Sequence, residues 1–179
     1  MNYRNKISWL AVTFSLIANI CLAQTEGEEK GHLQYGIKAG GGGFFYQSHT
    51  YYDASMGWRF NSKRYLGLGT GLHNIDIADD ADPSNENGVV PSIPLYIDYI
   101  HYLPFRHYHQ HSFTFGLEAG GGIYLDKLPL KDCSNRLYPY VNAIMGMDFA
   151  ISKHVGLDIG LNLIVSDASG LGLTAGLRF

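Results

Sequence analysis

The chain has 179 residues, 22 of them glycine, with 16% charged residues, 13% aromatic residues and a net charge of −3. The first 23 residues carry two cations, Arg4 and Lys6, so the remainder has a net charge of −5, which indicates no nucleic-acid partner. The charged share is well below the roughly 25% of a soluble globular domain. No run of about 18 apolar residues follows the first segment, which excludes a transmembrane helix there.

The N-terminal segment has the pattern of an export signal. Arg4 and Lys6 precede an apolar stretch that ends near Ala23, a plausible small-residue cleavage site. We therefore expect a signal peptide at 1–23, a short periplasmic segment at 24–32 and one outer-membrane β-barrel domain at 33–179. Cys133 is then the single cysteine of the exported chain, so it forms no internal disulfide, and an intermolecular one stays open.

The rest of the chain alternates in the way that strands do, and no helical period appears. The expected strands span residues 33–46, 51–60, 64–74, 92–104, 112–125, 139–151, 154–165 and 170–179. Short connections are expected at 47–50, 61–63, 104–111, 152–153 and 166–169, and long ones at 76–90 and 126–137. With both termini in the periplasm, the two long connections fall outside the cell, as in outer-membrane barrels.

The strand charges gather on one face, and the other face holds none. The charged face carries Lys38, Asp53, Arg59, Asp98, Glu118, Asp148, Asp158 and Arg178. A lipid-facing Arg or Lys at the membrane midplane costs about 2–4 kcal/mol, so this face should line the interior. These residues should form a paired charge network, and loss of Arg59 or Arg178 should lower stability by several kcal/mol.

Eight such strands predict an all-β, eight-stranded antiparallel transmembrane β-barrel with a filled polar lumen. A soluble lipocalin-like barrel would have the same periodicity with the two faces inverted. Aromatic residues near the strand ends favour the membrane, since girdles of such residues lie at membrane interfaces. We assign Phe45, Tyr46, Tyr51, Tyr52, Tyr96, Tyr124 and Tyr138 to one rim, and Trp58, Phe60, Tyr65, Tyr102, Phe105, Phe113, Phe149 and Phe179 to the other.

A partial internal repeat links the first and fifth strands. Residues 35–42 (YGIKAGGG) parallel residues 115–122 (FGLEAGGG), which places Lys38 and Glu118 at matching depth with opposite charge. We hypothesise that these two side chains approach each other across the lumen. The alternative is that glycine-rich strands of a narrow lumen simply look alike.

The last ten residues alternate strictly and end on an aromatic side chain. Leu173, Leu177 and Phe179 are expected to form the C-terminal signal that the barrel assembly machinery recognises, with outer-membrane lipid around the finished barrel.

Three segments, GWRFN at 57–61, YLGLGTG at 65–71 and IPLYID at 93–98, resemble the small outer-membrane β-barrels of Gram-negative bacteria. The pattern is most similar to the porin-family, OmpX-like group. The resemblance implies eight antiparallel strands around a narrow, largely filled interior. It implies no activity, because this family has no shared catalytic residues.

Candidate chemistry is sparse, and no cofactor is expected. Asp79, Asp80, Asp82 and Glu86, near Asp76, form an acidic external loop that is a weak candidate for Ca²⁺ or Mg²⁺. His107, His109 and His111 alternate in a turn and are a weak transition-metal candidate. Ser48 and His49, beside Asp53, are the one neighbouring pair for a lipid-modifying enzyme, but adjacent strand residues face opposite ways.

The sequence therefore favours a non-enzymatic barrel with a structural or surface-interaction role through its external loops and an unknown extracellular partner. A narrow pore for small solutes and a lipid-modifying outer-membrane enzyme are the alternatives.

Overall fold

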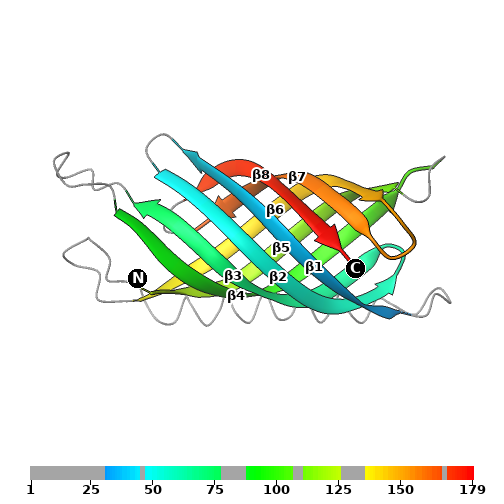
Figure 1. Cartoon of the computed structure of the whole chain (residues 1–179), viewed down its shortest axis with the longest axis horizontal. Coiled ribbons are helices and arrows are strands. Elements are labelled where there is room, and N and C mark those ends of the chain that lie inside the picture. The colour runs from blue at the N-terminus through cyan, green and yellow to red at the C-terminus, as the bar shows by residue number, and fades with distance from the viewer. Residues whose placement is uncertain (1–30, 45–46, 78–87, 107–110, 126–135, 167–168) are drawn as a thin grey trace, which may run out of the picture.

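The computed structural model describes residues 31–44, 47–77, 88–106, 111–125, 136–166 and 169–179. They form one closed barrel of eight strands in which each strand pairs with its chain neighbours (Figure 1). The strands are β1 (His32–Phe44), β2 (Gln47–Asn61), β3 (Arg64–Ile77), β4 (Gly88–Pro104), β5 (His111–Tyr124), β6 (Leu137–Ala150), β7 (Gly156–Val165) and β8 (Gly170–Arg178). Every pairing is antiparallel, as expected for an all-β eight-stranded barrel.

The pairing of β8 with β1 closes the barrel. Gly36 lies opposite Arg178, and the register continues to Gly43 opposite Leu171. Two backbone hydrogen bonds extend it, from Phe179 N to Tyr35 O at 2.9 Å and from Tyr35 N to Phe179 O at 3.0 Å. The sheet therefore has no unpaired edge between its first and last strands.

The expected strands are present, but three boundaries differ by three or more residues. Residues 47–50, which the sequence analysis assigned to a connection, belong to β2. β3 continues to Ile77 and β4 begins at Gly88, so the longest connection is shorter than the expected 76–90. In the sequence, the aspartate at 76 and the proline at 91 are residue types that disfavour a β-strand (Asp76 and Pro91). In the barrel they pair with Val89 and Asn74, so tertiary pairing overrides the local signal.

The outer wall of the barrel is apolar, and its inner wall is polar. Leu68, Leu95 and Leu173 are 60%, 66% and 65% exposed, whereas the Asp98 and Glu118 side chains are buried. This arrangement is the inverse of a soluble barrel, which buries its apolar face. None of the described residues forms a helix long and apolar enough to cross a membrane.

The interior is also rich in tyrosine, and here the expected aromatic girdles are partly wrong. Tyr51, Tyr65, Tyr96, Tyr102, Tyr124 and Tyr138, all assigned to the rims, are buried inside the barrel together with Tyr140. The reason is parity: Tyr51 precedes Asp53 by two positions, and Tyr96 precedes Asp98 by two, so each shares the inward face of its charged neighbour. Of the other rim residues, Tyr52, Trp58, Phe113 and Phe179 are exposed.

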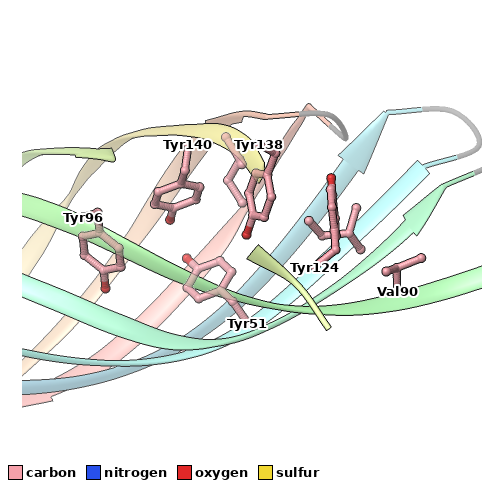
Figure 2. Packing of buried hydrophobic residues seen from close by; sticks show 8 residues of the cluster. Tyr51, Val90, Tyr96, Tyr124, Tyr138 and Tyr140 are labelled. Atoms are coloured by element: carbon pink, nitrogen blue, oxygen red, sulfur yellow. The ribbon is translucent and has the colours of Figure 1, made fainter. Parts of the chain in front are cut away.

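The lumen glycines make room for these rings. Gly40 lies opposite Tyr51, Gly69 opposite Tyr96 and Gly122 opposite Tyr138 in the strand registers. A Cβ atom added to any of the three glycines would collide with the ring of its tyrosine partner. Figure 2 shows Tyr51, Tyr96 and Tyr138 lying across the interior, where they fill the part of the barrel nearer the long connections. A ring that packs over a cross-strand glycine is a known way to stabilise curved sheets.

Replacing Gly69 with alanine should destabilise the barrel by about 1–3 kcal/mol, because the new methyl group overlaps the Tyr96 ring in a packed interior. The matched control is Gly121→Ala, where an added Cβ has one neighbour, the Tyr138 carbonyl oxygen at 3.2 Å. The temperature at which the detergent-folded protein loses its compact gel mobility measures both. Equal midpoints for the two variants would contradict the glycine–tyrosine packing.

Candidate functional site

All eight charged residues expected in the lumen lie on the inner wall, and they form two clusters. The loop-side cluster contains Lys38, Asp53, Asp98 and Glu118, and the termini-side cluster contains Arg59, Asp148, Asp158 and Arg178. Five of these eight are buried, with exposed fractions of 7% or less for Asp53, Asp98, Glu118, Asp148 and Arg178. Inward positions on the strands bring them together, since alternate residues of a strand share one face.

Lys38 is the centre of the loop-side cluster. Its Nζ contacts Glu118 Oε1 directly and lies 3.6 Å from Asp53 Oδ2. Glu118 also accepts hydrogen bonds from Tyr140 Oη at 2.9 Å and Asn142 Nδ2 at 3.0 Å. The structure thus brings together the pair that the internal repeat suggested. Burial makes such a pair costly to break, because one partner would remain charged and unpaired.

Two histidines extend the loop-side cluster toward the long connections. His73 Nε2 lies 2.9 Å from Asp53 Oδ1, and His73 Nδ1 lies 2.8 Å from His49 Nε2. A neutral His73 that donates from Nε2 to Asp53 accepts from His49 at Nδ1, so one tautomer satisfies both contacts. The alternation of the sequence did not predict these histidine contacts, because His49 falls in the expected connection 47–50. The even spacing from His49 to Asp53 would have placed both side chains inside.

Arg178 organises the termini-side cluster. Its guanidinium contacts Asp148 Oδ1 and Asp158 Oδ2 and donates to the Tyr102 hydroxyl. Asp148 and Asp158 lie directly opposite each other on β6 and β7. Like charges in that position repel, so a cation between them is what makes the pairing tolerable.

Arg59 has a different role from Arg178. It lies over the Tyr102 ring at 4.3 Å, while Arg178 lies over the same ring at 4.7 Å. Arg59 donates to the carbonyl oxygens of Asn61 and Ser62 at 3.3 and 3.0 Å. Among the described residues it forms no ion pair with a carboxylate.

Two spaces adjoin these clusters. A cavity of about 70 Å³ lies inside the barrel and is lined by residues of both clusters, including Asp98, Glu118 and Asp158. A vestibule of about 610 Å³ opens at the end of the barrel where β1 begins and β8 ends, and is lined by His32, Arg59 and Phe179 among others. Arg178 lines both spaces and is therefore part of the wall between them.

The remaining candidates do not form a site within the described residues. Asp79, Asp80, Asp82, Glu86, His107, His109 and Cys133 lie outside those residues, as does the expected signal peptide at 1–23. His111 Nδ1 accepts a hydrogen bond from Ala150 N at 3.3 Å. Ser48 is exposed and His49 buried, so this pair faces opposite sides of the wall. In the part of the chain that the structure describes, no three His, Cys, Asp or Glu side chains are arranged to hold a metal ion.

Comparison with known proteins supports the fold. No protein-family model matches the chain, and a search of the curated proteins finds no match. Among solved structures, the chain is similar to the crystal structure of Neisserial surface protein A (NspA). The TM-score is 0.54 at 14% sequence identity, and the match covers 86% of this chain and 98% of that one. At this identity the likeness concerns the fold alone.

The two arginines should differ in their contribution to stability. Arg178→Ala leaves Asp148 and Asp158 opposite each other without a cation, and we expect a loss of about 3–5 kcal/mol. Arg59→Ala removes hydrogen bonds to backbone carbonyls and a cation–π contact, which predicts a loss of about 1–2 kcal/mol. Urea unfolding midpoints in detergent give both values. Equal losses would show that Arg178 has no special role in the cluster.

Proposed function

We propose that this chain is a small non-enzymatic outer-membrane β-barrel with a structural or surface-interaction role through its external loops. The observation that carries the proposal is the sorting of side chains around a closed sheet, with large apolar residues outside and charges inside. In lipid, a closed barrel satisfies its backbone hydrogen bonds without water, and an apolar outer wall is the favoured surface.

The lengths of the strands fit this role. The strands have between 9 and 17 residues, and a tilted strand needs about 9–11 to cross a bilayer. In water, by contrast, the same outer wall would be a continuous apolar surface far larger than soluble monomers tolerate.

The distribution of the connections supports loops on the cell surface as the functional part. At the end of the barrel where β1 begins and β8 ends, β2 and β3 are separated by residues 62–63 alone, whereas β3 and β4 are separated by 78–87 at the opposite end. Long loops on a rigid barrel are the usual place for partner binding. The structural neighbour carries the name of a surface protein, which agrees with this proposal.

A narrow pore is the second candidate, and the two internal spaces are the observation in its favour. A path would run from the vestibule past Arg178 into the cavity, and would then have to pass the tyrosine-filled half of the lumen. Conductance across a planar bilayer distinguishes the two functions. The packed interior favours a closed barrel without steady conductance, and ion-selective steps of current would favour the pore.

The membrane location is tested by a charge on the outer wall. Leu68→Arg places a cation on a central lipid-facing position, where the cost is about 2–4 kcal/mol, and should reduce heat-modifiable barrel in the outer-membrane fraction. Leu137→Arg is the matched control, since Leu137 is 71% exposed but begins β6 near the rim. Normal assembly of both variants would favour a barrel that stands in water.

The orientation is tested by labelling Cys133 on intact cells with a membrane-impermeant maleimide. With the long loops outside, the unmodified chain is labelled before lysis. The control is the double variant Cys133→Ser, Ser152→Cys, whose cysteine follows β6 at the termini end and should react only after lysis. The reverse pattern would place the long loops in the periplasm and remove the surface-loop role.

A further inference from the structure

The inner cavity has one carboxylate that forms no direct ion pair with the described residues. Asp98, Glu118 and Asp158 all line it. Glu118 is paired with Lys38, and Asp158 is paired with Arg178. Asp98 forms no ion pair with any described residue, although its carboxylate is only 4% exposed.

The position of Asp98 makes this deficit costly. Asp98 Oδ1 is buried without a hydrogen-bond partner. Glu118 lies directly opposite Asp98 on β5, with both side chains on the inner wall, so two carboxylates adjoin each other. A buried, ionised carboxylate without a partner is strongly disfavoured, so Asp98 either takes up a proton or needs a positive charge beside it.

The neighbouring cations are already engaged. Lys38 contacts Glu118 and lies 3.6 Å from Asp53, so one ammonium serves two other carboxylates. Arg178 serves Asp148 and Asp158. The loop-side cluster alone has one cation and three carboxylates, Asp53, Asp98 and Glu118, so a net negative charge remains beside the cavity.

We propose that the cavity binds a small alkali cation, such as sodium, at the Asp98 carboxylate. The cavity volume of about 70 Å³ has room for a small ion and several waters. Hard cations prefer oxygen ligands. Besides Asp98, the cavity wall supplies the hydroxyl groups of Ser55 and Thr114, and Ser55 lies within interaction range of Asp98. Such an ion is held by one carboxylate, by hydroxyl groups and by water. The site therefore needs no group of three His, Cys, Asp or Glu ligands, and none is found among the described residues.

The experiment compares the full chain refolded in detergent with sodium chloride or with N-methylglucamine chloride at equal ionic strength. The organic cation is too large for the cavity, so only sodium can occupy it. We expect a higher unfolding midpoint in sodium, by about 3 °C at a concentration well above the dissociation constant. Equal midpoints in the two salts would overturn the proposal and indicate that Asp98 holds a proton instead.

Variants locate the effect. Asp98→Asn should abolish the difference between the two salts, whereas Asp148→Asn, a carboxylate outside the cavity lining, should keep it. If Asp98→Asn does not fold, Thr114→Val removes an oxygen ligand with little change in shape and should reduce the difference. A sodium effect that persists in both cavity variants would place the ion elsewhere and refute the site. Broadening of the ²³Na resonance by the folded chain, absent in Asp98→Asn, gives a readout independent of stability.

Discussion

The alternation of side chains across a closed sheet is the constraint on which the other features depend. Once β8 pairs with β1, every residue faces either the outer wall or a lumen that eight strands keep narrow. An inward charge then has little access to bulk water and needs a partner on another strand. This explains why Lys38 bonds across to Glu118 on β5, and why Arg178 lies between Asp148 and Asp158.

The same constraint explains why glycine and tyrosine occur together. In a narrow lumen a ring needs space beside it, and Tyr96 faces Gly69 while Tyr51 faces Gly40 on one side and His73 on the other. The rings fill the half of the barrel nearer the long connections, while the termini side has the vestibule. The barrel is therefore asymmetric along its axis: tyrosine rings pack around the loop-side cluster toward one end, and the termini-side cluster adjoins the open vestibule at the other.

The barrel and its inward charges could be predicted from the sequence, because alternate residues of a strand face the same wall, and this alternation can be read along each strand separately. The absence of charge on one face of every strand predicted both the barrel and the inward position of all eight charged residues. Depth and partner are not local: the shared role of Arg178 for two carboxylates depends on the register of β6, β7 and β8. Tyr51 and Tyr102 lie near strand ends, which favoured the rims. Their even spacing from Asp53 and Asp98 places them on the inward face instead.

The inner wall and the connections are under different structural constraints, because the interior of the barrel is closely packed. The inward charges and tyrosine rings contact one another closely, so substituting one of them disturbs several neighbours at once. The long connections, 78–87 and 126–135, lie between strands and are not among the strands that close the sheet. Under the proposed surface role, contacts change through loop residues, while the inner wall keeps sets of side chains that fit together and pair their charges. The loop-side cluster departs from that pairing, since Lys38 stands against three carboxylates, and an ion bound at Asp98 would reduce the excess negative charge with no change to the wall.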